Sequence, residues 1–141
     1  MDFPDPTSAE QAFYVAFREL DEHRMLAVWA DSVDASCIHP GGTLLRGTHD
    51  ILASWREIFD EASPPRIEHR LIQASSDERL AVHTVEEKVS SGEGGRRAVI
   101  LATNVYVFTA GGWRMLAHHA SLPLVESKEP PEPSESPHAL H

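Results

Sequence analysis

The chain has 141 residues, of which 41% are hydrophobic, and it carries a formal net charge of −10. This size and composition suit one folded domain, whereas the acidic balance argues against nucleic acid and anionic membrane surfaces, which both select Lys and Arg. The lone cysteine, Cys37, excludes an intramolecular disulfide, and no apolar run reaches the ~20 residues of a membrane span. We therefore expect a soluble cytoplasmic protein.

Composition divides the chain into three parts. Residues 1–6 are expected to form a short leader, and residues 7–125 the folded domain. Residues 126–141 are rich in Pro, Glu and Ser and poor in apolar side chains. Such a segment buries too little surface to offset its ordering entropy, so a disordered tail is predicted.

The first half of the domain carries helical patterns. Apolar residues recur with a helical period from Thr7 to about Trp29, which predicts one long amphipathic helix capped near Ser8. A short strand is predicted at residues 37–39, where Pro and Gly residues end it. A second helix is expected over residues 49–60, with Thr48 as its cap.

The pattern of the second half predicts strands separated by short turns. Strands are predicted over residues 67–74, 80–89, 97–109 and 113–121, with Ser-rich or Gly-rich turns between them. Short turns favour an antiparallel meander. Helices first and strands afterwards predict an α+β fold, with the helices packed on the concave face of a curved sheet.

Two groups of residues carry a family resemblance. Cys37-Ile38-His39-Pro40 is followed by Gly47 and Ser54-Trp55, and Gly112-Trp113-Arg114 is followed by His118-His119-Ala120-Ser121. This order resembles SnoaL-like domains of the nuclear transport factor 2-like superfamily, which share the ketosteroid isomerase-like and cystatin-like fold. The nearest likeness is to the association-domain group of calcium/calmodulin-dependent protein kinase II.

The resemblance implies a cone-shaped domain with a pocket between helices and sheet, and dimerisation through the outer sheet face. That face is expected to carry Val99, Leu101, Val105 and Val107. The superfamily includes isomerases, cyclases, dehydratases and non-catalytic assembly domains, so the fold alone does not give a function.

His119 and His83 are the candidate catalytic residues. Period-two alternation places Trp113, Met115 and His119 on one face of the last strand, and this more apolar face is expected to point inward. His83 shares a face of its strand with the apolar Ala81 and Val85. An inward imidazole suits a general base or a ligand donor, but a buried histidine satisfied by backbone or water is the competing interpretation.

Five further residues are candidates for ligand binding. They are His39, Trp55, Trp29, Asn104 and Tyr106. The two tryptophans lie at helical positions that suit either the core or an apolar cavity wall. Asn is depleted in strands, so Asn104 suggests a ligand contact or a hydrogen bond to a neighbouring strand.

Other chemistry is less well supported. No Asp falls on the last two predicted strands, which counts against a ketosteroid isomerase mechanism. His39, His83 and His119 lack the spacing of a metal site, and no cofactor motif is present, so neither metal nor cofactor is predicted.

We therefore expect a homodimeric domain that binds a small, largely apolar molecule. The sequence leaves open whether it is an enzyme. The alternatives are a His-dependent lyase or isomerase acting on a small hydrophobic or aromatic substrate, and an oligomerisation module.

Overall fold

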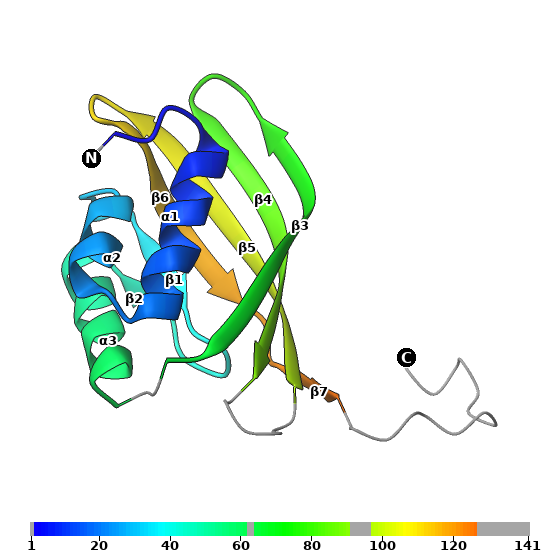
Figure 1. Cartoon of the computed structure of the whole chain (residues 1–141). Helices are drawn as coiled ribbons and strands as arrows, with labels where there is room; N and C mark the ends of the chain where they lie inside the picture. Colours follow the sequence, from blue (N-terminus) through cyan, green and yellow to red (C-terminus); the bar gives the residue numbers. More distant parts are fainter. Residues whose placement is uncertain (1, 62–63, 91–96, 127–141) are drawn as a thin grey trace.

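The computed structural model describes residues 2–61, 64–90 and 97–126, so the predicted tail lies outside the described residues from residue 127 onward (Figure 1). The α+β fold is confirmed. The elements are α1 (Pro6–Glu19), α2 (Glu22–Val28), β1 (Ser36–Ile38), β2 (Leu45–Arg46), α3 (Thr48–Glu61), β3 (Arg66–Ser76), β4 (Leu80–Ser90), β5 (Arg97–Thr109), β6 (Gly112–Ala120) and β7 (Leu124–Glu126). No helix in this described part is long and apolar enough to cross a membrane.

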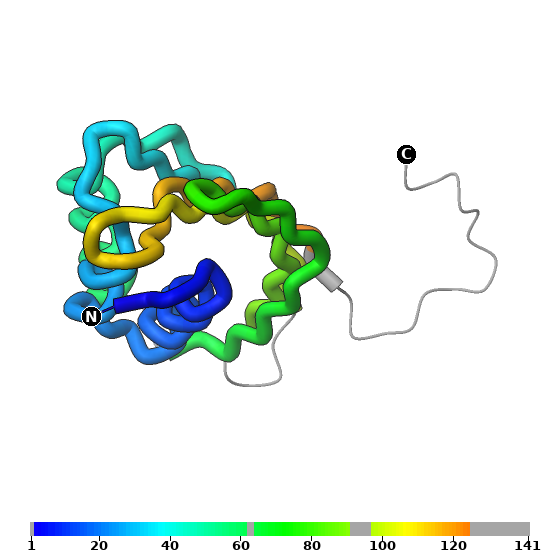
Figure 2. The backbone as a smooth tube through the Cα atoms, turned by 90° about the horizontal axis from the view of Figure 1, so that it is seen from above, coloured from blue at the N-terminus to red at the C-terminus, as the bar shows by residue number. Residues whose placement is uncertain are grey.

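One curved sheet holds the strands in the order β2-β1-β6-β5-β4-β3, with β7 beside β5. The view from above shows α1 inside the curve of this sheet (Figure 2). The apolar stripe of α1, including Phe13 and Ala16, is fully buried there, as are Tyr106 and Met115 on the facing strands. The concave face of the sheet therefore holds the core.

The predicted single helix over residues 7–29 is wrong, because it is broken into α1 and α2. Leu20 adopts a left-handed conformation (φ 53°, ψ 44°), and its N–H caps the end of α1. The Asp21 side chain then accepts a hydrogen bond from Arg24 N and starts α2. The N-cap of α1 is Asp5, with Pro6 as the first helical residue, and not Ser8.

The four long strands lie within two residues of the predicted ranges, and their meander is antiparallel. The short strand β1 pairs parallel with β6 and antiparallel with β2. The short strands β2 and β7 were not predicted. The N-terminal segment also joins the fold, because Phe3 is buried in the core and bridges Gly112.

An irregularity in β6 has the largest effect on the site. Val105 pairs with Ala117, but the next residue, Tyr106, pairs with Met115, so Leu116 is an extra residue in its strand. Such a β-bulge reverses the inward and outward alternation beyond it. Met115 and His118 therefore both face the core.

Candidate functional site

Seven buried polar side chains meet between α1 and the sheet, and we refer to them as the interior polar cluster. They come from four elements: Glu10 and Tyr14 of α1, His83 and Glu87 of β4, Asn104 and Tyr106 of β5, and His118 of β6. None is more than 3% exposed. Polar groups are rarely buried in this number, and each needs a partner.

The Glu10 carboxylate is the acceptor at one side of the cluster. Its Oε1 atom lies 3.1 Å from His83 Nδ1 and accepts from Tyr106 Oη at 2.9 Å and Asn104 Nδ2 at 3.5 Å. The carboxylate is thus surrounded by donors from two strands, which compensates for its burial.

A second series of hydrogen bonds crosses the cluster in one direction. His118 Nδ1 lies 2.6 Å from Asn104 Oδ1, an acceptor, so this nitrogen carries the proton. Asn104 Nδ2 donates to Tyr14 Oη at 3.0 Å, and Tyr14 Oη donates to Glu87 Oε2 at 2.6 Å. Four side chains on four elements are therefore linked from β6 to β4.

Burial changes the protonation of the groups at both ends of this series. Desolvation raises the pKa of Glu87 to about 7, although the hydrogen bond from Tyr14 opposes this shift. Desolvation lowers the pKa of His118 to about 3, so the imidazole is neutral at pH 7. Burial also raises the pKa of both tyrosines, Tyr14 and Tyr106.

The predicted orientation of His83 is confirmed, but that of His119 is wrong. His119 is exposed on the outer face, where its Nε2 lies 2.9 Å from Ser36 Oγ. The bulge at Leu116 explains the reversal, because it brings His118 inward instead. His83 and His119 thus lie on opposite sides of the sheet and do not share a cavity.

Asn104 and Tyr106 lie in the interior polar cluster, whereas His39 lies outside it. His39 Nε2 contacts Ser54 Oγ at 2.9 Å, and its ring meets Trp55 edge-on with 4.7 Å between centroids. Burial lowers the pKa of His39. The thiol of Cys37 nearby is buried, and desolvation raises its pKa to about 12, so it is protonated at neutral pH.

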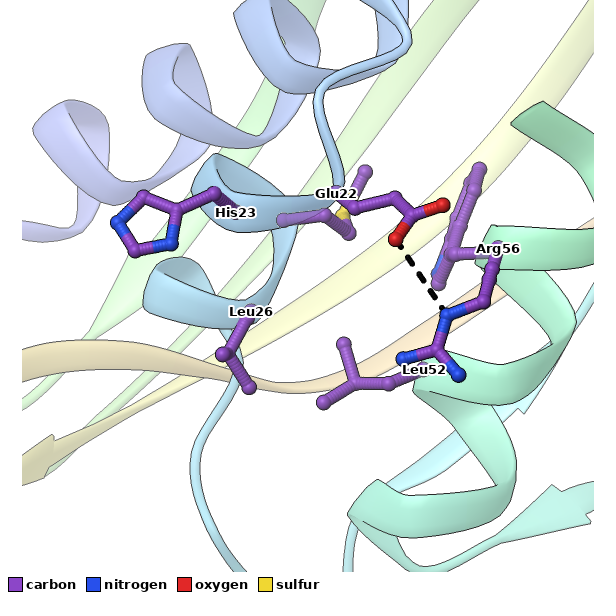
Figure 3. A pocket seen from close by; sticks show the side chains of 7 residues that line it. Glu22, His23, Leu26, Leu52 and Arg56 are labelled. Carbon is purple, nitrogen blue, oxygen red and sulfur yellow. Dashed lines mark hydrogen bonds and ion pairs between the residues drawn. The ribbon is translucent and has the colours of Figure 1, made fainter. Parts of the chain in front are cut away.

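A cavity of about 290 Å³ opens between α2 and α3. Figure 3 shows Glu22 of α2 reaching toward Arg56 of α3 and Leu26 beside Leu52, whereas the ring of His23 points away from α3. Met25 and Trp55, which are almost fully buried, complete the lining. The floor is apolar, and Arg56 Nε pairs with Glu22 Oε2 across the rim at 3.4 Å.

Trp55 connects this cavity with the interior. It lines the cavity, and its ring also lies 6.1 Å from that of His118, measured between centroids. Its Nε1 atom is buried and has no hydrogen-bond partner among the residues that the structure describes. Trp29 lines a different cavity of about 640 Å³, between residues 26–34 and the β5–β6 hairpin, so the two tryptophans do not form one site.

The sequence interpretation missed Glu10, Tyr14, Glu87 and His118. Glu10 and Tyr14 are four residues apart and lie on the same side of the helix as the buried Phe13. Helical periodicity therefore indicates that both face the interior. Glu87 follows His83 by four residues on a strand, which places both on one face. No comparable signal marks His118, because the bulge is not visible in the local sequence.

The chain belongs to the SnoaL-like domain family, which matches residues 7–125. It is 38% identical to a proposed calcium/calmodulin-dependent protein kinase type II association domain from Thiobacillus denitrificans. That crystal structure superposes with a TM-score of 0.83, covering 88% of this chain and 98% of the other.

Histidine, cysteine, aspartate and glutamate residues within the described ranges form no group of three that suits a metal ion.

Two further relatives extend the comparison. A crystal structure of a proposed dehydratase of the NTF2-like family from Streptomyces avermitilis is 29% identical, with a TM-score of 0.75, and covers 84% of this chain and 92% of that one. F-box protein SKIP8 of Arabidopsis thaliana is 25% identical over 122 residues. These span 86% of this chain and 51% of SKIP8, so the chain matches about half of that protein.

Proposed function

We propose that the chain is a cytoplasmic homodimer that binds a small, largely apolar molecule in the cavity between α2 and α3. The observation that carries this proposal is the cavity itself, a hollow of about 290 Å³ in which four apolar side chains lie beside charged and polar groups. Ligand sites in proteins are mostly apolar concavities of roughly 300–1,000 Å³ with a few polar groups that fix orientation. The cytoplasmic location is supported by the lone, buried Cys37.

The rim defines what the polar end of such a ligand would be. Arg56 uses Nε for its ion pair with Glu22, and no other hydrogen bond of its guanidinium occurs within the described part of the chain. The two terminal nitrogens of Arg56 suit a carboxylate or sulfonate, which they bind as a fork. We therefore favour an aromatic or aliphatic acid.

The fluorescent probe 8-anilinonaphthalene-1-sulfonate tests this proposal, because it joins an apolar body to an anionic group. Leu52→Trp fills the cavity, and Leu122→Trp is the matched control at an exposed position away from it. The wild-type chain and the control should bind the probe equally, and Leu52→Trp should bind at least tenfold more weakly. Equal binding by all three would contradict the α2–α3 site.

A His-dependent lyase or isomerase is the second candidate, and the pairing of Glu10 with His83 favours it. A carboxylate that fixes one imidazole nitrogen leaves the other, Nε2, as a proton acceptor. In a dehydration this nitrogen would take the α-proton from carbon, the C–O bond would break, and the imidazolium so formed would give that proton to the departing hydroxide, which leaves as water. The resemblance to a proposed dehydratase gives independent support.

Turnover of small aromatic β-hydroxy ketones, followed by NMR, tests the enzymatic alternative. Removing a positioned acid or base costs roughly 10²–10⁴-fold in rate. We expect His83→Asn and Glu10→Gln to lose activity on this scale. Glu19→Gln, an exposed carboxylate at the end of the same helix, should keep it. No turnover by the wild-type chain across the series would remove the support for this candidate.

A further inference from the structure

A small cavity with an unusual charge lies at the end of β3, β4 and β5. It has a volume of about 90 Å³ and is lined by Arg66, Glu68, Lys88, Ser90 and Arg97. Strand register explains the grouping: Arg66 pairs with Ser90, Glu68 with Lys88, and Ser90 with Arg97. Residues that face each other across antiparallel strands share one face of the sheet, so all five side chains lie together.

The three cationic side chains of this cavity have no side-chain partner within the described residues. No hydrogen bond or ion pair of the Arg66, Lys88 or Arg97 side chain occurs there, although their backbones pair in the sheet. Arg70, two residues from Glu68 along β3, is paired by contrast with Glu86 at 3.4 Å. The five lining residues hold three cations and one carboxylate, a sum of +2 on a chain whose net charge is −10, and Glu126 of β7 pairs in register with Arg97.

We propose that this cavity binds the phosphate group of a soluble small molecule. A phosphate monoester carries a charge of about −1.5 to −2 at pH 7, which matches the local charge, and its oxygens accept from guanidinium, ammonium and hydroxyl donors alike. The volume suits one phosphate group and not a whole metabolite, so the remainder of the ligand lies in solvent. Arg66 and Arg97 are exposed, so salt weakens the binding.

This site is separate from the proposed α2–α3 cavity, because the two share no lining residue. They also differ in character, since the α2–α3 cavity has an apolar floor and the strand-end cavity is lined by polar side chains. The inference therefore stands or fails independently of the proposed function.

A titration of the full chain with inorganic phosphate, followed by amide NMR shifts at constant ionic strength, tests the inference. Saturable shifts in β3, β4 and β5 are expected, and sodium chloride should not reproduce them. Lys88→Gln should weaken phosphate binding at least fivefold, and Glu68→Gln should strengthen it by removing the repelling carboxylate. Arg70→Gln is the matched control and should bind like the wild-type chain.

Three results would overturn the inference. The first is a set of shifts that chloride reproduces, which would indicate ionic strength alone. The second is equal weakening by Lys88→Gln and Arg70→Gln, which would indicate a diffuse surface effect. The third is co-sedimentation with phosphatidylcholine vesicles containing phosphatidic acid but not with phosphatidylcholine alone, which would assign the cavity to a lipid headgroup. Thermal unfolding followed by circular dichroism checks that every variant is folded.

Discussion

Glu87 and His118 lie at opposite ends of one series of hydrogen bonds, and burial shifts their pKa values in opposite directions. A carboxyl in a poorly solvated site holds its proton, whereas an imidazole there loses it. Both groups therefore tend to be neutral near pH 6. Between pH 4.5 and pH 6.5 the two effects oppose each other, so the contribution of this pair to the stability of the folded state should be level there and should decline below and above that range.

Glu87 determines how the stability of the folded state changes as the pH rises. Its pKa is raised from 4.5 to about 7, so the unfolded chain ionises first as the pH rises through this window. The contribution of Glu87 to the free energy of unfolding should fall across the window by about 3 kcal/mol. Glu87→Gln removes this loss and still accepts from Tyr14, so urea unfolding should find it more stable than the wild-type chain at pH 8 but not at pH 4. Glu86→Gln, which faces outward, should show no such difference.

His118 determines how the stability of the folded state changes as the pH falls. Its pKa is lowered from 6.5 to about 3, so between these values the unfolded chain binds a proton that the folded chain does not. The contribution of His118 to the free energy of unfolding should therefore fall as the pH falls through this window, by about 5 kcal/mol in full, and the opposite change at Glu87 offsets this fall down to about pH 4.5. His118→Gln should flatten this acid limb, and the neighbouring outward His119→Gln should not. An unchanged acid limb in His118→Gln would contradict the assignment.

At the scale of elements, the break between α1 and α2 positions one wall of the α2–α3 cavity. Asp21 starts α2 by accepting from Arg24 N at 3.0 Å, and this helix has only seven residues. Loss of an N-cap costs roughly 0.5–2 kcal/mol. Asp21→Ala should therefore lower the free energy of unfolding by about 1 kcal/mol and weaken probe binding at the cavity.

Asp31→Ala provides the control for this change, because Asp31 is exposed and caps no helix. Its urea midpoint should match that of the wild-type chain. If Asp21→Ala unfolds at the same urea concentration as the control, the cap contributes nothing and the start of α2 has another cause.

The long strands and α3 were predictable because their apolar periodicity is strong and local. The short strands β2 and β7 were not, because two or three residues carry too little pattern. The helix break was missed because Leu20 is an unusual residue in a left-handed conformation, where Gly or Asn is the usual signal.

The candidate site was predicted in part. Period-two alternation correctly placed His83, Asn104 and Tyr106 inside, because β4 and β5 are regular along their length. It failed on β6, where Leu116 is inserted in the strand. The contacts of Glu10 and Glu87 depend on how α1 crosses the sheet, which no local pattern in the sequence specifies.

At the scale of the whole molecule, the outer sheet face bears on the proposed dimer. Leu80, Val82 and Leu101 are 41%, 38% and 51% exposed there, and Val105 and Val107 beside them are half-buried. An apolar patch of this kind is typical of an interface. Leu101→Lys should convert the proposed dimer to a monomer in analytical ultracentrifugation, whereas Leu44→Lys, equally exposed in a loop, should not. A monomeric wild-type chain would contradict the dimer.

His118 and His119 are adjacent, and this changes what the loss or gain of one residue near Leu116 would do to the interior. Losing or gaining one residue at this point of β6 exchanges which histidine faces the core, and in both registers the interior still receives an imidazole. A duplicated side chain beside a bulge thus makes the strand tolerant of a one-residue slip. At other positions a one-residue insertion or deletion would remove an inward side chain. Here it leaves an imidazole facing the core.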